Sequence, residues 1–197
     1  PLPEAAPGVL GSTAVDPLLR LLADYNVLLL GPGLGRADVT LRFVPAVLSG
    51  LRNAWPVAPD AIPDFNDVAS CVVDADGLNA LAEQHEWWMA MPKRTLLTPH
   101  SGEMARLMRT TPEEVNADRL GKARAAAAQW GAVVVLKGAF TLIAAPDGRA
   151  NVNPSANPAM ATAGTGDVLA GAIAGLLAQG LEPFTAAVVG VYLHARA

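Results

Sequence analysis

The chain has 197 residues, 52% of them hydrophobic, and a formal net charge of −4. This length and composition predict a single domain over residues 1–197 with a sizeable core. The negative charge argues against nucleic acid or an anionic membrane as a partner, so a small molecule is the expected ligand. A lone cysteine, Cys71, excludes an intrachain disulfide and indicates a buried, inert thiol. The absence of a disulfide fits a reducing cytoplasm, which is the expected location. Polar residues and proline interrupt the apolar stretches before they reach membrane-spanning length, so a soluble protein is expected.

Strands and helices are predicted to alternate along the first half of the chain. The expected elements are a helix over 16–25, a strand over 27–30, a glycine-rich loop over 31–36, a helix over 38–51, an irregular connection, a strand over 71–74 and a helix to residue 84. Asp16 followed by Pro17 is typical of a helix N-cap and first helical position. Pro45 makes the middle of the second helix uncertain.

The second half continues the alternation and adds a hairpin. The expected elements are a strand over 95–98, a turn over 99–103, a helix over 104–108, an Ala-rich helical region from a capping box at 111–114 to about residue 130, a strand over 133–136, hairpin strands over 141–145 and 149–153, a helix after the glycines at 164–166, and a last helix from residue 183. The predicted fold class is therefore α/β, a mainly parallel central sheet with helices on both faces and a late β-hairpin at an antiparallel edge.

The sequence Gly164-Thr-Gly-Asp167 runs directly into the small-residue apolar segment 168–178. A glycine-bracketed turn that opens a helix leaves backbone N–H groups unpaired at the positive end of the helix dipole, where anions bind. Asp167 adds a carboxylate beside that spot, which suits a base that takes a proton from a hydroxyl while the amides stabilise a phosphoryl group. Taken alone, these four residues are more often an ordinary helix cap.

Three other loops follow strands in the same way, at 31–36, 74–79 and 98–103. The carboxyl ends of parallel strands meet at one edge of a sheet, so the four loops are expected to line one crevice. The glycines at 31–35 match neither the Walker pattern nor the dinucleotide fingerprint, so dinucleotide binding of the Rossmann kind is not supported. An ordinary turn is the alternative for this loop.

Five motifs occur in a fixed order along the chain. They are Gly31-Pro-Gly-Leu-Gly35, Asp74-Ala-Asp-Gly-Leu-Asn79, Leu97-Thr-Pro-His-Ser-Gly-Glu103, Leu136-Lys-Gly-Ala-Phe-Thr141, and Asn157-Pro158 followed by Gly164-Thr-Gly-Asp-Val-Leu-Ala-Gly171. In this order they resemble the ADP/ATP-dependent NAD(P)H-hydrate dehydratases, a branch of the ribokinase-like fold, over about residues 26–195. Ala163 stands where that family usually has glycine, and Gly77 where it often has alanine.

The resemblance implies a repair reaction on hydrated NADH or NADPH, written NADHX and NADPHX. A phosphoryl group of ADP or ATP is transferred to the C6 hydroxyl of the nicotinamide ring, and phosphate is then eliminated to restore NAD(P)H. Mg²⁺ is the implied metal, and a homo-oligomer is expected. Compared with that family, the chain is expected to be incomplete at both ends and to lack an epimerase domain.

The resemblance also assigns roles to individual residues. Asp167 is the implied base, with the amides of Gly164, Thr165 and Gly166 holding the transferred phosphoryl group. The implied substrate-binding residues are Gly33, Gly35, His100, Asp167, Asp74 and Asn79. The implied nucleotide-binding residues are Lys137, Gly138, Ala139, Phe140, Thr141 and Gly166. Glu103 is the implied metal residue, acting through water, and a turn-stabilising role is an equal alternative for Asp76 and Asn79.

Two other functions stay open on the sequence. A small-molecule kinase of the same fold, acting on a vitamin-precursor alcohol, would use the Gly-Thr-Gly-Asp turn and Glu103 equally well. A nucleotide-binding module without catalysis is the second. The sequence leaves open the choice between ADP and ATP and between NADHX and NADPHX.

Overall fold

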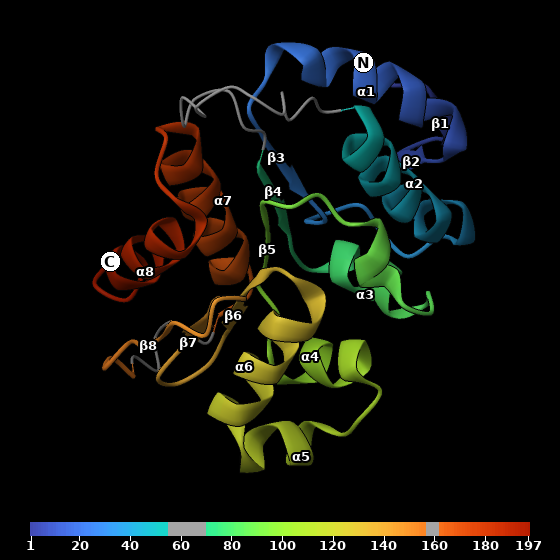
Figure 1. Ribbon diagram of the computed structural model, residues 1–197. Coiled ribbons are helices and arrows are strands. Elements are labelled where there is room, and N and C mark those ends of the chain that lie inside the picture. Colours follow the sequence, from blue (N-terminus) through green and yellow to red (C-terminus); the bar gives the residue numbers. More distant parts are fainter. Residues whose placement is uncertain (55–69, 157–161) are drawn as a thin grey trace.

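The computed structural model of the chain describes residues 1–54, 70–156 and 162–197. At its centre is a six-stranded sheet in which the strands follow one another in chain order (Figure 1). The strands are β3 (Val27–Leu30), β4 (Ser70–Val73), β5 (Thr95–Leu97), β6 (Val133–Leu136), β7 (Leu142–Ala144) and β8 (Ala150–Val152). Strands β3 to β6 pair in parallel, whereas β7 and β8 are antiparallel to their neighbours. The predicted mainly parallel sheet with a late hairpin is confirmed.

Helices cover both faces of this sheet (Figure 1). They are α1 (Val15–Leu21), α2 (Asp38–Ala54), α3 (Asp76–Ala82), α4 (Ser101–Met108), α5 (Pro112–Ala117), α6 (Arg119–Trp130), α7 (Thr165–Ala178) and α8 (Pro183–His194). Alternate strand residues enter two separate cores: Cys71 and Val73 join the core under α2, α3, α4 and α6, and Val72 joins the core under α7 and α8. Because successive residues of a strand point to opposite faces and both faces are covered, nearly every residue in these strands is apolar.

Within the described residues, none of the helices combines the length and apolarity that crossing a bilayer requires. Cys71 is fully buried, as predicted, and burial raises the pKa of its thiol to about 12. A thiol with so high a pKa stays protonated at neutral pH and is a poor nucleophile.

The first two predicted helices differ from the structure at their boundaries. Helix α1 begins at Val15 with Ala14 as its N-cap, so the prediction that Asp16 caps the helix is wrong. A 3₁₀ turn over Ser12–Ala14 leads directly into α1, which places Asp16 in its first turn. Helix α2 runs without a break through Pro45 to Ala54. A proline inside a helix removes one backbone donor, and the buried apolar face of α2 offsets that loss.

The helical region predicted over 111–130 is two helices rather than one. Asp118, at φ −144° and ψ 68°, breaks the chain between α5 and α6, and its carboxylate accepts a hydrogen bond of 2.9 Å from the Gly121 N–H. Aspartate competes for backbone donors in this way and therefore favours N-caps over helix interiors. The predicted cap at Thr111 and the predicted end at Gly131, which adopts φ 62°, are confirmed.

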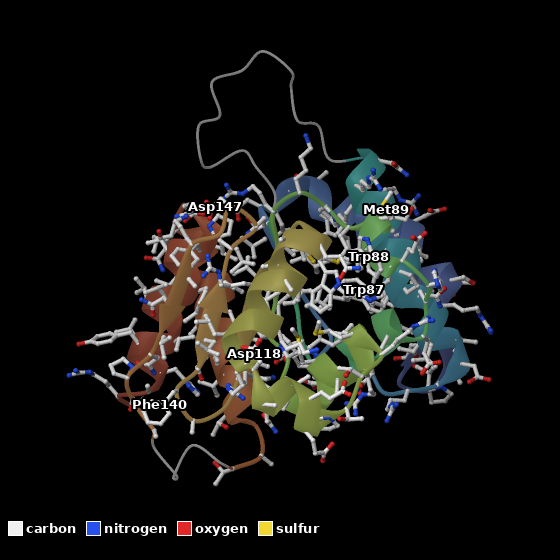
Figure 2. All side chains as sticks on the ribbon, turned by 60° about the horizontal axis from the view of Figure 1, so that its bottom comes forward. Trp87, Trp88, Met89, Asp118, Phe140 and Asp147 are labelled. Atoms are coloured by element: carbon white, nitrogen blue, oxygen red, sulfur yellow. The ribbon has the colours of Figure 1, made fainter. Side chains whose placement is uncertain are left out.

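Two short features were not predicted. A small hairpin of β1 (Glu4–Ala6) and β2 (Val9–Leu10) precedes the first helix. A 3₁₀ helix over Trp87–Ala90 carries Trp87, Trp88 and Met89 (Figure 2). Trp87 is buried against Trp130, with ring centroids 4.7 Å apart. Segments of two to four residues show no periodicity that a sequence analysis could detect.

Candidate active site

The loops that follow the parallel strands meet at one edge of the sheet. Backbone hydrogen bonds continue the ladder beyond the strands, from the Asp74 N–H to the Leu30 carbonyl (3.1 Å), from the Thr98 N–H to the Val73 carbonyl (3.2 Å) and from the Lys137 N–H to the Pro99 carbonyl (2.8 Å). The loops after the parallel strands therefore meet at one edge, as predicted, although residues 31–36 and 74–79 do not line the cavity described below.

Two glycines allow the loops after β3 and β4 to touch. Gly31 adopts φ 136°, and a Cβ there would overlap the Asp74 carbonyl oxygen. A Cβ on Gly77 would lie 2.8 Å from both the Leu30 carbonyl oxygen and a Val73 methyl group. This close packing explains why glycine, rather than a larger residue, suits position 77 in this chain.

A buried ionic cluster lies where β4, β6 and α4 meet. The Lys137 Nζ is 2.7 Å from the Asp74 Oδ1 and 3.7 Å from the Glu103 Oε2. Asp74 is fully buried, and its Oδ2 has no hydrogen-bond partner in the part of the chain that the structure describes. The predicted contact between Asp74 and the substrate therefore lacks support, since this carboxylate faces Lys137 and is closed to solvent.

His100 and Glu103 form a reciprocal cap at the start of α4. The His100 Nδ1 accepts hydrogen bonds from the N–H groups of Gly102 (2.9 Å) and Glu103 (3.3 Å), and the Glu103 Oε2 accepts one from the His100 N–H (2.8 Å). Because Nδ1 is an acceptor, a neutral ring carries its proton on Nε2, which lies 3.4 Å from the Glu103 Oε1. Half of the His100 side chain, 53%, is exposed, so the ring is fixed in place and open to a ligand.

No group of three or more His, Cys, Asp or Glu side chains within 1–54, 70–156 and 162–197 is arranged to hold a metal ion. Both oxygens of Glu103 already face His100, and one also faces Lys137. Magnesium keeps several waters and binds phosphates with only one or two carboxylates, so a nucleotide would supply most of its ligands here. The role of Glu103 through water stays a prediction.

The N-terminus of α7 lies against the ionic cluster. Gly164 is the N-cap at φ 86°, and no side chain of the described residues caps the helix. A Cβ on Gly166 would lie 3.3 Å from the Lys137 Nζ, so glycine lets the helix end approach the ammonium group. Asp167 follows in the first turn and is exposed. The helix N-terminus and the Lys137 ammonium, which is paired with Asp74 and Glu103, thus lie side by side, with the Asp167 carboxylate in the first turn of the helix.

Part of the predicted motif cannot be placed. The stretch 157–161, which includes Asn157 and Pro158, lies outside the described residues. The N–H and the hydroxyl of Thr165 both donate to the Thr162 carbonyl oxygen, at 3.4 and 2.8 Å. Thr165 is thus held within the turn by its own neighbour.

A cavity of about 570 Å³ opens beside this helix end. Of the described residues, those that line it come from the loops after β5 and β6, the segment after β8, and helices α7 and α8: His100, Lys137, Gly138, Ala139, Thr141, Asn153, Ser155, Ala156, Thr162, Thr165, Gly166, Leu169, Val191, His194 and Ala195. The structure thus brings together all but one of the predicted nucleotide-binding residues. Phe140 is the exception: it is 52% exposed at φ 54° and lies on the hairpin side, far from Trp87 (Figure 2).

Of the predicted substrate-binding residues, five are not among those that line this cavity: Gly33, Gly35, Asp74, Asn79 and Asp167. The Gly35 N–H donates to the Asp76 Oδ2 at 3.0 Å, and Asn79 contacts both Asp76 and Arg106. Asp76 and Asn79 therefore hold the glycine loop in place, which agrees with the turn-stabilising alternative. His100 lines the cavity and is the predicted substrate residue that reaches it.

Two further residues were not singled out from the sequence: Arg119, which holds the loop after β6 but does not line the cavity, and His194, which does line it. Arg119, the first residue of α6, donates to the carbonyls of Leu136 (3.1 Å) and Lys137 (3.3 Å), and burial lowers the pKa of its guanidinium. His194 lines the cavity from α8, and its Nε2 is buried without a partner in the described part of the chain. A histidine in an otherwise apolar helix is the signal that could have singled out His194.

Comparisons with known proteins add an independent finding. A family model described as NAD(P)H-hydrate dehydratase matches residues 3–197. The chain is 47% identical over 196 residues to the bifunctional NAD(P)H-hydrate repair enzyme Nnr of Moorella thermoacetica, covering 100% of this chain and 34% of that protein. It is 42% identical over 176 residues to the ADP-dependent (S)-NAD(P)H-hydrate dehydratase of Neisseria meningitidis, covering 88% and 54%.

Solved structures of a dehydratase and of a ribokinase-like protein are also similar to this chain. The crystal structure of the ADP/ATP-dependent NAD(P)H-hydrate dehydratase from Bacillus subtilis, co-crystallised with ATP and Mg²⁺, matches with a TM-score of 0.69 and 33% identity, over 90% of this chain and 58% of that one. A ribokinase-like superfamily protein from Enterococcus faecalis matches with a TM-score of 0.74 and 28% identity, over 95% and 60%. The chain spans about a third of the bifunctional relatives and between half and two thirds of the others.

Proposed function

The chain belongs to the NAD(P)H-hydrate dehydratase family, and from this premise we propose that it takes part in the nucleotide-dependent dehydration of NADHX or NADPHX to NADH or NADPH. The observation that carries the proposal is the cavity in which Lys137, Gly138 and Gly166 meet beside the N-terminus of α7. A phosphate binds best where a lysine and unpaired helix amides converge.

In the proposed first step, the Asp167 carboxylate takes the proton of the C6 hydroxyl as that oxygen forms a bond to the terminal phosphorus of ADP or ATP. The bond from this phosphorus to the bridging oxygen breaks, and AMP or ADP leaves. The amides of Gly164 and Gly166 and the Lys137 ammonium would stabilise the negative charge on the transferred group. Mg²⁺, bound through the nucleotide phosphates, would neutralise further charge.

In the second step, phosphate leaves from C6. The C6–O bond breaks as the lone pair of the ring nitrogen forms a double bond to C6, and the neighbouring ring carbon then loses a proton to water, which gives the dihydronicotinamide. The role proposed for His100 is to position the hydrated ring, because its ring is anchored at Nδ1 by two backbone N–H groups and exposed toward the cavity.

The test is to mix the protein with NADHX, Mg²⁺ and either ADP or ATP and to follow the return of reduced-nicotinamide absorbance. Return that requires nucleotide supports the proposal, and the faster donor identifies the preferred nucleotide. Failure of the absorbance to return with either nucleotide would contradict it. A stable phosphorylated alcohol as product would instead indicate the small-molecule kinase.

The further expectations of a single domain, a homo-oligomer and a cytoplasmic location belong to the same proposal. They rest on one continuous sheet with two cores and on the family. Light scattering of the purified protein, with and without ADP, measures the oligomeric state, and a monomer under both conditions would contradict the second expectation.

A further inference from the structure

A chain of polar contacts joins the glycine loop to helix α4 on the side away from the cavity. The Gly35 N–H donates to the Asp76 Oδ2 (3.0 Å), the Asn79 Nδ2 lies 3.5 Å from the Asp76 Oδ1, and the Arg106 Nε donates to the Asn79 Oδ1 (3.0 Å). Arg106 is thus tied through Nε to the loop whose glycines are the predicted substrate-binding residues. The contact fixes the direction of its guanidinium group.

The guanidinium points back along α4 toward His100. Helical side chains lean toward the N-terminus of their helix, and the Arg106 Nη1 comes within 3.9 Å of where a Cβ on Gly102 would sit. The same Cβ would lie 2.9 Å from the His100 Cε1. Gly102 therefore leaves a bare stretch of backbone between the imidazole and the guanidinium, and both groups border it.

Arg106 keeps its full charge available on this surface. It is exposed and forms no ion pair with a described residue, and its hydrogen-bond partner Asn79 is neutral. The nearby carboxylates are engaged elsewhere: Asp76 with Gly35 and Asn79, and Glu103 with His100 and Lys137. The Gly102 and Glu103 amides already donate to His100, so Arg106 supplies the free donors here.

We propose that Arg106 binds a phosphate group of the dinucleotide substrate while His100 contacts the hydrated nicotinamide end. This inference rests on the proposed function, because only a phosphorylated substrate supplies the anion. Arginine held through Nε presents its terminal N–H groups as a fork that matches phosphate oxygens. Two phosphates of the substrate fit this chemistry, the diphosphate bridge common to NADHX and NADPHX and the 2′-phosphate present in NADPHX alone.

The test compares Arg106→Gln with the wild-type protein by measuring KM for NADHX, NADPHX and ADP. Loss of a charge-assisted hydrogen bond is expected to raise KM for the hydrate about tenfold. The KM for ADP and kcat are expected to change less than about twofold. Arg106→Lys keeps the charge but loses the paired N–H groups of the guanidinium, so its KM for the hydrate is expected to lie between those of the wild type and Arg106→Gln. A rise for both hydrates identifies the diphosphate, and a rise for NADPHX alone identifies the 2′-phosphate.

Arg109→Gln is the matched control, because Arg109 is exposed at the other end of α4 and contacts the Gln84 carbonyl at 3.5 Å. It is expected to leave every KM unchanged. Unchanged hydrate KM values in Arg106→Gln, or an equal rise in the KM for ADP, would overturn the inference while leaving the proposed function intact. Inactivity of the wild-type protein in the same assay would instead overturn the proposed function.

Discussion

The two sides of the α7 N-terminus are built differently. The proposed nucleotide side is an open cavity in which Lys137 lies between the buried carboxylates of Asp74 and Glu103. The proposed substrate side is an exposed surface on which the glycine loop is tied to Asp76. The first side is held by buried charges, so removing one partner should lower the free energy of unfolding strongly. The second side is held by exposed hydrogen bonds, so removing one partner there should lower it less. Variants on the two sides should differ in their effects on stability as well as in the ligand affected.

The largest effect is expected from Asp167→Asn, at the junction of the two sides. A general base contributes roughly 10²–10⁴-fold to rate, so kcat should fall by that factor while the affinity for ADP is largely kept. Steady-state kinetics and ADP titration calorimetry measure the two quantities. Asp38→Asn is the control, since Asp38 is another exposed aspartate in the first turn of a helix. Equal kcat values in Asp167→Asn and the wild type would show that the base lies elsewhere.

The ion pairs of Lys137 with Asp74 and Glu103 predict that removing the lysine lowers stability strongly. Lys137→Met leaves the fully buried Asp74 unpaired and should lower the free energy of unfolding by about 3 kcal/mol in urea denaturation. Adding Asp74→Asn removes the unpaired charge, and the double variant should regain most of that loss. Lys93→Met, at an exposed lysine, should have little effect. A double variant less stable than Lys137→Met alone would contradict an effect based on charge.

Arg119→Met tests whether the two sides bind different ligands, and it leaves the ion pairs of Lys137 with Asp74 and Glu103 in place. The side chain fixes the carbonyls of Leu136 and Lys137, and its removal should raise the KM for ADP about tenfold while the KM for NADHX is kept. Arg124→Met, at an exposed arginine on the same helix, is the control. An equal rise in the KM for NADHX would contradict the proposal that the two sides bind different ligands.

The smallest effect is expected far from both sides, at the cap of α8. Burial raises the pKa of Glu182, but hydrogen bonds from Thr185, Phe184 and Arg149 outweigh it, so the pKa is lowered. A lowered carboxyl pKa contributes stability above its unfolded value, and that stability is lost as pH falls through the folded value. Glu182→Gln should therefore cost about 0.5 kcal/mol at neutral pH. In urea denaturation below the folded pKa of Glu182, this difference should vanish, whereas an equal difference at both pH values would contradict the assignment.

The sequence predicts well the features that depend on local chemistry. The strand positions, to within one or two residues, and the cap at Thr111 follow from residues a few positions apart, and the structure confirms them. It also predicts that the loops after the parallel strands meet at one edge of the sheet, because parallel strands have a common carboxyl edge.

Contacts between distant residues could not be predicted in this way. Asp74 was expected at the substrate, but its direction is set by Lys137, 63 residues further on. Arg119 reaches the carbonyls of Leu136 and Lys137, and His194 reaches the cavity, only because α6 and α8 pack where they do. The exposure of Phe140 follows from its φ of 54°, which no neighbouring residue indicates.

The most direct test of the two-sided site follows the oxygen atom that both sides act on. NADHX labelled with heavy oxygen at the C6 hydroxyl is converted with ADP and Mg²⁺, and the inorganic phosphate is analysed by mass spectrometry. If phosphoryl transfer at Asp167 precedes elimination, the phosphate carries the label, with one AMP formed for each NADH. If the label appears in water and the phosphate is unlabelled, the hydroxyl leaves without being phosphorylated, and the account of this site is contradicted.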